Sequence, residues 1–329
     1  MANKVSVVIC TRDRADLIGN AIESVAACDY PAFDLSVMDQ STNTDTEAVV
    51  ARLRTELADR CTIHYHHLDQ AGLSRAYNAG FRVTDAPVVA CTDDDVVVPS
   101  NWLTTIAAAF DNDSEVGLLY GQVLVPASLA HVPKGTIVPS LVWTDRERLH
   151  EAKHNFKVWG MGANMAIRRE AMDAVGGFDE IMGGGAPLRS SQDFDFALRV
   201  YRAGYAVLLD PDVQVDHYGA RTADQWPGTL VAYGIGDGAF FGKHMRCRDL
   251  LVSSLFVRKV ARLFAKSAYD AGRNRRVPKL DDYGRNIFTG LKQGARYDVD
   301  RETRLYAENA RAVGGVTEAN AVTGARRAG

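Results

Sequence analysis

Three consecutive carboxylates, Asp93-Asp94-Asp95, follow directly after a short apolar segment at residues 86–91. Adjacent like charges repel each other and are costly to bury unpaired, so a cation must compensate them. A divalent metal ion is the economical choice, because carboxylate oxygens bind such ions, which in turn bridge to the phosphates of a substrate. A solvated acidic loop is the alternative for these three residues alone, and the rest of the chain has to decide.

Polar and charged residues also follow two further apolar segments. Thr11, Arg12 and Asp13 come directly after residues 5–10, and Asp39 comes after residues 35–38. In sheets of parallel strands, ligands bind beyond the carboxyl ends of the strands. We therefore expect these residues and the three carboxylates to line one crevice that binds a metal ion and a nucleotide.

Apolar strands alternate with helices along the chain, which predicts βαβ units, a parallel sheet and the α/β fold class. The predicted strands are residues 5–10, 35–38, 62–68, 88–91, 116–125, 159–167, 207–209 and 213–215. The predicted helices are residues 15–27, 45–57, 72–83, 99–110, 168–175 and 191–203, with Ser100 as the N-cap of the fourth. A long connection at residues 126–157 indicates a functional or mobile loop, and Gly183-Gly184-Gly185 fits a lid hinge.

Two residues in the later part of the chain could complete the chemistry. Asp193 lies in the first turn of a helix, where an acidic residue also compensates the helix dipole and so has a structural explanation. Asp195 is expected to point elsewhere. A lone histidine is more often structural than a ligand, but His217 stands at a strand end near the suspected metal, which favours a ligand role.

The composition is that of an ordinary globular protein, but the charge is unevenly distributed. Of 329 residues, 47% are apolar and 24% are charged, with a net charge of −3. Residues 243–329 contain 19 Lys/Arg and 9 Asp/Glu, a net +10, whereas residues 1–242 contain 19 and 32, a net −13. This asymmetry indicates a metal site in the front part and contact with an anionic surface in the back part.

Cysteine usage and hydropathy indicate a location. The five cysteines are scattered and lack CxxC spacing, which argues against a disulfide framework or a zinc site and for a reducing compartment. No signal peptide is visible, and no run of about 18 apolar residues predicts a transmembrane helix. We expect a cytoplasmic protein, and peripheral contact with the inner face of the cell membrane stays open.

In order and spacing, several segments resemble the family 2 glycosyltransferases with the GT-A fold, over about residues 4–220. The matching segments are Ser6–Asp13, Val37–Thr42, Gly72–Gly80, the DxD element Thr92–Asp95, Gly162–Arg169 with Gly176–Glu180, and Gln192-Asp193. The resemblance implies a Rossmann-like mixed sheet, mostly parallel and flanked by helices. It also implies a glycosyltransferase of the hexosyltransferase type, similar to those of bacterial surface-polysaccharide and cell-envelope biosynthesis.

The resemblance implies roles on the donor side. Asp39 would accept a hydrogen bond from the nucleobase, and Arg75 would lie near the diphosphate. Asp95 would coordinate Mn²⁺ or Mg²⁺, with Asp93 at the ribose or the metal and His217 as a further metal ligand. The residues implied to bind the nucleotide sugar are Thr11, Arg12, Asp13, Asp39, Arg75, Asp93 and Asp94.

On the acceptor side, the resemblance makes Asp193 the catalytic base, with Trp159, Gly160, Asn164 and Gln192 near it. The metal ion would neutralise the departing nucleoside diphosphate. The base would take the proton from an acceptor hydroxyl as that hydroxyl attacks the anomeric carbon from the opposite face. One such displacement inverts the configuration at this carbon.

Two features depart from the family pattern. Gln192 occupies a position often held by Glu, which removes one charge beside Asp193 and leaves Asp193 the better candidate base. Gln225-Trp226 lacks the Arg of the QxxRW element of processive synthases, and no membrane spans follow. We therefore expect the enzyme to add one sugar or a few rather than a long polymer.

The basic back part is predicted to be helical. The glycine-rich segment 233–241 follows no strand, so closely packed helices or an edge of the acceptor cleft explain it better than a dinucleotide fingerprint. Residues 250–268 form an amphipathic helix with a basic face, which either packs on the core or touches anionic lipid. Residues 298–312 are predicted to form one more helix with an Asp300–Arg304 pair, and the end of the chain to be disordered.

The predicted organisation is a GT-A catalytic domain at residues 1–222, with a nucleotide-sugar half at about 1–125 and an acceptor half at 126–222. A helical extension at 223–312 and a disordered tail at 313–329 follow. The expected donor is a UDP- or dTDP-sugar, with a GDP-sugar also open, and the expected acceptor is a glycan or a polyprenyl-linked glycan. Two rival functions stay open, an α/β phosphotransferase or phosphohydrolase and a non-catalytic sugar-nucleotide-binding protein. Nucleic-acid binding is not expected, because aromatic residues do not alternate with the arginines of the tail.

Overall fold

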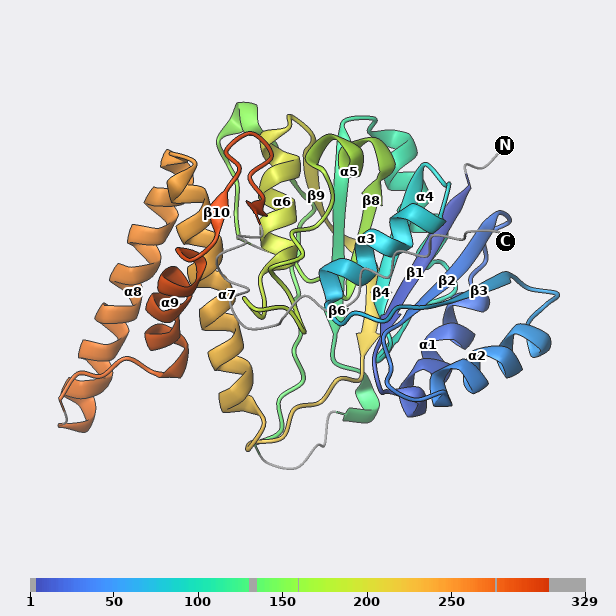
Figure 1. Cartoon of the computed structure of the whole chain (residues 1–329), viewed down its shortest axis with the longest axis horizontal. Coiled ribbons are helices and arrows are strands. Elements are labelled where there is room, and N and C mark those ends of the chain that lie inside the picture. The colour runs from blue at the N-terminus through green and yellow to red at the C-terminus, as the bar shows by residue number, and fades with distance from the viewer. Residues whose placement is uncertain (1–3, 130–134, 159, 276, 308–329) are drawn as a thin grey trace, which may run out of the picture.

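The computed structural model describes residues 4–129, 135–158, 160–275 and 277–307 and contains one large mixed sheet (Figure 1). The strand order is β3-β2-β1-β4-β8-β6-β9-β5, with β7 paired to β9. Six of these strands run in one direction, and β5, β7 and β8 run in the other. The strands are β1 Val5–Thr11, β2 Phe33–Asp39, β3 Thr62–His67, β4 Val88–Asp93, β5 Val96–Val97, β6 Val116–Leu124, β7 Glu147–Leu149, β8 Asn164–Arg168 and β9 Ala206–His217.

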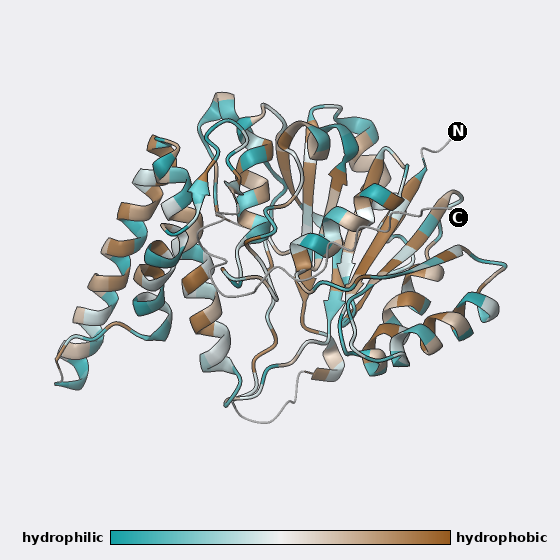
Figure 2. Cartoon of the chain, in the orientation of Figure 1, coloured by the Kyte–Doolittle hydropathy of each residue, from teal (hydrophilic) through white to brown (hydrophobic). Residues whose placement is uncertain are grey.

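Helices cover both faces of the sheet, and this explains why its central strands are almost wholly apolar. Along β1, Val7 and Ile9 belong to one hydrophobic cluster, and the intervening Val8 and Cys10 belong to the other. The first cluster lies under α1, α2 and α4, and the second under α3, α5 and α6. These helices are α1 Ala15–Ala26, α2 Asp45–Glu56, α3 Leu73–Val83, α4 Trp102–Asn112, α5 Arg169–Val175 and α6 Gln192–Arg202. Figure 2 shows the apolar character of the strands between the layers.

The parallel strands bring their carboxyl ends to one edge of the sheet. Thr11 is the register partner of Asp39, and Cys10 is the partner of Asp93, so the ends of β1, β2 and β4 are level. The residues predicted to line one crevice therefore follow strands that end side by side at one edge of the sheet.

Three further helices follow the sheet, α7 Trp226–Arg246, α8 Leu250–Asn274 and α9 Asp282–Gly294. The glycine-rich segment lies inside α7 and allows its backbone to approach α9. A Cβ atom at Gly238 would lie 2.0 Å from the Ile287 carbonyl oxygen, and one at Gly290 would lie 2.0 Å from the Ile235 carbonyl oxygen. The structure therefore confirms closely packed helices, the first of the two explanations offered by the sequence, and this packing does not exclude the second, an edge of the acceptor cleft.

The helical extension shares its core with the sheet. Ala239, Phe240 and Phe241 of α7 belong to the same hydrophobic cluster as Tyr120 of β6 and Met165 of β8. The division predicted at residue 222 therefore marks a change of secondary structure within one core. Among the described residues, no helix has both the length and the apolar character that crossing a membrane requires.

The early part of the sheet agrees with the sequence prediction, and several later details differ. Ser100 does not cap α4, which begins at Trp102 after Asn101. Strand β8 begins at Asn164, five residues later than predicted, because Gly162 and Ala163 form a turn directly before it. The strands predicted at 207–209 and 213–215 are one strand, β9, whose pairing with β6 shifts register between Gly121 and Gln122.

The helix predicted at residues 298–312 is wrong over its described part. Residues 298–307 form two short antiparallel strands, β10 Asp298–Val299 and β11 Tyr306–Ala307. Asp300 caps the turn between them by accepting the Glu302 N–H at 2.8 Å, and Arg304 pairs with Asp249 at 2.8 Å rather than with Asp300. The rest of this prediction and the predicted tail at 313–329 lie outside the described residues.

Candidate functional site

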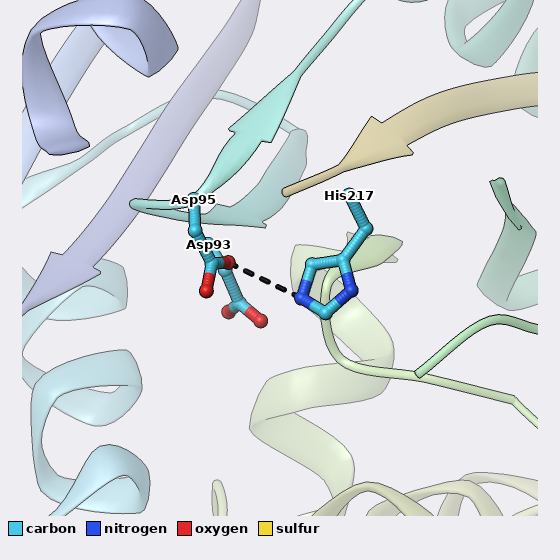
Figure 3. Close-up of side chains that lie close together, drawn as sticks. All are labelled: Asp93, Asp95 and His217. Atoms are coloured by element: carbon cyan, nitrogen blue, oxygen red, sulfur yellow. Dashed lines mark ion pairs between the residues drawn. The ribbon is translucent and has the colours of Figure 1, made fainter. Parts of the chain in front are cut away.

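Asp93, Asp95 and His217 form a cluster at the carboxyl edge of the sheet (Figure 3). Asp93 ends β4, and the two-residue strand β5 that follows pairs antiparallel with β9, so that Val96 lies opposite His217. This pairing carries the histidine to Asp95, with Nε2 3.3 Å from Oδ1. One ligand atom from each of the three residues lies within 4.8 Å of the others.

Three observations show that this cluster fits a divalent cation. His217 Nδ1 lies 2.8 Å from the Pro139 carbonyl oxygen, to which it donates, and this leaves the Nε2 lone pair facing the carboxylates. Asp95 Oδ1 is buried and accepts no hydrogen bond from the described residues. A Cβ atom at Gly219 would lie 2.5 Å from Asp95 Oδ2 and 2.6 Å from His217 Nε2, so glycine leaves space there. Oxygen and imidazole donors around such a space suit Mn²⁺ or Mg²⁺.

The electrostatics of the cluster also favour a cation. Burial, with a further contribution from Asp95, raises the pKa of Asp93 to about 7. Burial raises the pKa of Asp94 to about 6, although Arg14 opposes this. Burial also acts on Asp95, but His217 and Arg14 outweigh it and lower its pKa. A bound divalent ion would favour the ionised form of every carboxylate here.

Arg14 is one of the residues that the sequence prediction missed. It precedes α1, and its two terminal nitrogens lie 2.5 Å from Asp94 Oδ1 and 2.5 Å from Asp95 Oδ2. Thr11 Oγ1 also donates to Asp94, at 2.7 Å. Asp94, which we predicted to bind the nucleotide sugar, therefore also anchors the loop after β1. The available signal was that Arg14 lies in the same loop as Arg12, and nothing in the sequence shows which of the two side chains turns inward.

A cavity of about 350 Å³, here the donor cavity, lies in front of these residues. Asp93 and Asp94 line it together with Arg14 and Arg221, so carboxylates and guanidinium groups face the same space. Arg221 was not predicted either, although it follows His217 by four residues. The full lining is Cys10, Thr11, Arg12, Arg14, Gln40, Gly72, Leu73, Asp93, Asp94, Gly184, Gly185 and Arg221.

The structure brings the remaining donor-side residues close to this cavity but not into it. Asp13 connects the loop after β1 to the loop after β2, since its Oδ1 accepts the Thr42 N–H at 2.8 Å and the Thr42 hydroxyl at 3.0 Å. Asp39 is fully buried, and its carboxylate accepts the Ser41 N–H at 2.8 Å and the Tyr65 hydroxyl at 2.9 Å.

Arg75 is engaged elsewhere in the described chain. It pairs with Glu180 at 2.8 Å and donates to the Gln70 side chain at 3.1 Å, and it is not among the residues that line the donor cavity. Its predicted place near a diphosphate stays a prediction.

A second cavity of about 470 Å³, here the acceptor cavity, joins Asp93 to Asp193. Gly160 and Gln192 line it as predicted for the acceptor side, whereas Trp159 lies outside the described residues. The helical extension contributes an aromatic wall, formed by Trp226 and Tyr233 of α7 and Tyr283 of α9. The helical extension therefore completes this cavity.

Asn164 does not line the acceptor cavity. Its side chain is fully buried, donates to the carbonyl oxygens of Gln122 and Val213 at 2.8 and 3.1 Å, and accepts the Trp102 indole N–H at 3.0 Å. These bonds join β8 to β6, β9 and α4. Asn164 therefore has a packing role, and direct contact with an acceptor has no support in its geometry.

Asp193 has the environment of a general base. Burial raises the pKa of Asp193 to about 6, although the backbone N–H groups of Phe194 and Gly162 oppose this. Asp237, which lines the same cavity, raises the pKa of Asp193 further through its negative charge. A carboxylate with this pKa is ionised at neutral pH and is a stronger base than an ordinary aspartate.

A buried charge network holds the helix that carries Asp193. As predicted, Asp195 points away from the cavity, and it lies 2.6 Å from Lys243 and 2.9 Å from Arg199. Lys243 also pairs with Asp179 at 2.6 Å, and His244 Nε2 lies 2.7 Å from Asp195. The network connects α6 to α7, so it fixes the base relative to the wall of the acceptor cavity.

Comparisons with known proteins agree with this arrangement. The family model described as Glycosyl transferase family 2 matches residues 6–176. The "Glucosyl-dolichyl phosphate glucuronosyltransferase" of Haloferax volcanii is 25% identical over 238 residues, which cover 68% of this chain and 72% of that protein. The "Beta-monoglucosyldiacylglycerol synthase" of Synechocystis is 20% identical over 232 residues, 67% of this chain and 45% of that protein.

Solved structures are similar in fold. The mannosyltransferase PcManGT from Pyrobaculum calidifontis, in complex with GDP-Man and Mn²⁺, superposes with a TM-score of 0.57 at 16% identity, covering 90% of this chain and 74% of that one. TarS from S. aureus superposes with a TM-score of 0.51 at 15% identity, covering 71% of this chain and 39% of that one. The mixed sheet flanked by helices is thus the GT-A fold.

Proposed function

The chain belongs to glycosyl transferase family 2, and from this premise we propose that it is a metal-dependent, inverting glycosyltransferase that uses a nucleoside diphosphate sugar. The observation that carries the proposal is the position of Asp93. This carboxylate lines both the donor cavity and the acceptor cavity, and it belongs to the cluster that fits a metal ion. A diphosphate on one side and an acceptor hydroxyl on the other would therefore meet at the metal.

The side chains around the donor cavity suit a nucleoside diphosphate. Arg14 and Arg221 offer planar guanidinium groups for phosphate oxygens, and Thr11 and Arg12 line the same space. When bound by Asp93, Asp95 and His217, Mn²⁺ or Mg²⁺ would supply Lewis-acid stabilisation of the departing diphosphate. Because Arg14 is paired with Asp94 and Asp95 in the free chain, it would exchange one of these partners for a phosphate.

Asp193 is the proposed base. It would accept the proton of an acceptor hydroxyl while that oxygen attacks the anomeric carbon, opposite the leaving diphosphate. The Tyr120 hydroxyl donates to the backbone carbonyl oxygen of Asp193 at 2.9 Å, which helps to fix the position of this residue. A single attack of this kind gives inversion.

The donor base and the acceptor are the finer parts of the proposal. We favour a UDP- or dTDP-sugar as donor and keep a GDP-sugar as an alternative. Asp39 would reach the nucleobase only if its hydrogen bonds to Ser41 and Tyr65 rearrange. The aromatic wall of the acceptor cavity suits the apolar faces of a sugar ring, which supports a glycan or lipid-linked glycan as acceptor. Transfer of one sugar or a few is consistent with a chain that lacks the QxxRW element.

No observation favours the phosphotransferase alternative, since it assigns no task to Asp193 or His217. Family membership also makes a non-catalytic binding protein the weaker explanation, because the candidate base and the candidate metal ligands are all present.

Thermal unfolding tests the donor part of the proposal. Specific binding to the native state raises the apparent melting temperature, so UDP, dTDP and GDP are each compared with and without Mn²⁺. We expect one nucleotide to stabilise the protein far more in the presence of Mn²⁺ than with EDTA. Sugar transfer from the matching donor is then measured with EDTA and after restoring Mn²⁺ or Mg²⁺. Full transfer in EDTA would contradict the metal assignment.

A further inference from the structure

Helix α8 is the outermost element on its side of the molecule, with α7 and α9 between it and the sheet (Figure 1). Its first half packs on α7, where the rings of Phe256 and Phe241 lie 5.3 Å apart. Only Val252 and Ala271 of its 25 residues are buried. The sequence left open whether this helix packs on the core, and the structure shows that most of its surface faces solvent.

Large apolar side chains lie on the exposed surface of α8. Leu250 is 83% exposed, Val257 65% and Phe264 53%, and their spacing of seven residues places them on one face of the helix. Tyr269, at 66%, lies further along the helix. Apolar side chains scattered singly over a surface need no explanation, but an aligned row on one helix indicates a contact surface.

A row of positive charges lies on another part of the exposed surface of α8. The helix contains five basic residues and one acidic residue. Arg258, Arg262 and Arg273 are exposed, and among the described residues none of them makes an ion pair within 4.0 Å. At 100° per residue the three arginines lie within about 60° of one another, and Val257 and Phe264 lie about 100–180° away from them around the helix. Lys266 is also exposed, and it makes one long ion pair, with Asp281 at 3.6 Å.

We propose that α8 docks the protein on an anionic lipid membrane, lying in the plane of the interface with Val257 and Phe264 among the acyl chains. A helix with exposed apolar side chains on one face and basic side chains on another is suited to this position. The unpaired arginines identify the occupant, because each is attracted to acidic headgroups and none has a partner within the described chain. The described residues from 243 onward, 243–275 and 277–307, contain 15 Lys/Arg and 7 Asp/Glu, a net +8, and this charge reinforces the attraction.

The docking would bring the acceptor cavity close to the bilayer. Lys259, on the inner side of α8, lies 2.6 Å from Asp237, and Asp237 lines the acceptor cavity beside Asp193. One layer of helices, about 10 Å thick, therefore separates the membrane-facing surface from the cavity. A lipid-linked acceptor would then meet the base at the membrane surface. This last step rests on the proposed glycosyl transfer, whereas the docking itself does not.

Vesicle co-sedimentation of the full chain tests the docking. The vesicles consist of phosphatidylcholine alone or of phosphatidylcholine mixed with phosphatidylglycerol. We expect binding to the mixed vesicles that weakens as salt increases, because surface charges are screened. Replacing Arg258, Arg262 and Arg273 by Gln should weaken it on the order of 100-fold. The control carries the same charge change on exposed Arg54, Arg60 and Arg82, far from α8, and should bind like the wild type.

A second pair of variants tests the apolar contact. Phe264→Ser should weaken vesicle binding without lowering the melting temperature, because its side chain is half exposed, and Val83→Ser, with 48% exposure on α3, should change neither. Equal binding of the wild type and the α8 variants would overturn the proposal. So would a stable dimer in light scattering that Phe264→Ser dissociates, since a second copy would then be the occupant.

The same assay separates this inference from the proposed function. Asp193→Asn should bind vesicles like the wild type, whatever it does to sugar transfer. Absence of transfer with every donor, together with intact vesicle binding, would contradict the proposed function and leave the docking supported.

Discussion

Replacing Asp193 by Asn is the most direct test of the proposed chemistry. Asparagine keeps the size of the side chain and can still hydrogen-bond, but it cannot accept the proton of a hydroxyl. General base catalysis contributes typically 10²- to 10⁴-fold, or about 3–5 kcal/mol of transition-state stabilisation. We therefore expect kcat to fall by about that factor, while nucleotide binding, which involves the donor cavity, is unchanged.

The environment of Asp193 also predicts a pH dependence. Burial raises the pKa of Asp193 to about 6, and the base works only when ionised. Lowering the pH from about 7 to about 5 reduces its ionised fraction from about nine tenths to about one tenth, so activity should fall by about tenfold. Because the charge of Asp237 contributes to the raised pKa, Asp237→Asn should shift this acid limb to lower pH.

Initial rates of nucleotide release, measured from about pH 5 to pH 8 with saturating donor, report these changes. Asp173→Asn, the same substitution at an exposed position of α5, serves as the control and should behave like the wild type. A kcat for Asp193→Asn within about tenfold of the wild type would remove this residue from the role of base. An acid limb that Asp237→Asn leaves in place would refute the electrostatic part of the reasoning.

Three further predictions concern the metal, the buried network and the helix contact. His217→Ala should abolish most of the thermal stabilisation by Mn²⁺ plus nucleotide, with metal affinity at least about tenfold weaker by titration calorimetry; unchanged affinity would contradict the ligand role. Lys243→Met should lower the free energy of unfolding, measured by urea denaturation, by about 3–5 kcal/mol, because two buried carboxylates lose their shared cation. Lys292→Met, at an exposed position, should leave this free energy unchanged. Equal effects of the two substitutions would argue against the network. Gly290→Ala should lower the free energy of unfolding by about 1–3 kcal/mol, because its Cβ would meet the Ile235 carbonyl oxygen. Gly272→Ala on α8, where a Cβ has nothing within 4 Å, should instead raise it by up to about 1 kcal/mol. A stabilising Gly290→Ala would contradict the close packing of α7 and α9.

The sequence was most informative where local pattern and topology act together. Apolar runs that end in Thr11, Asp39 and Asp93 predict parallel strands, and parallel strands of one sheet necessarily end at the same edge. The positions of these residues therefore followed from the pattern alone. His217 could be predicted for the same reason, since it ends a strand.

The sequence was less informative about side chains that leave loops. Arg12 and Arg14 are the same residue type in the same loop, so the sequence does not distinguish them. Only the backbone of the turn before α1 directs the Arg14 side chain to Asp94 and Asp95. Asn164 was misjudged because its strand passes the cavity while its side chain joins three other elements. Contacts between distant segments decide such cases, and a local pattern does not encode them.

The short pairing of β5 with β9 has a consequence for how the protein folds. Asp95 and His217 are far apart in the sequence, and they meet only after the last strand of the sheet has been added beside Val96. Contacts of such long sequence separation form late and slowly, because the chain must first lose the entropy of the intervening loop. The complete ligand set would thus exist only when the sheet is nearly complete. A bound metal ion would then slow unfolding, because it would hold β9 next to β5. Metal affinity would then report how completely a given preparation of the protein has folded.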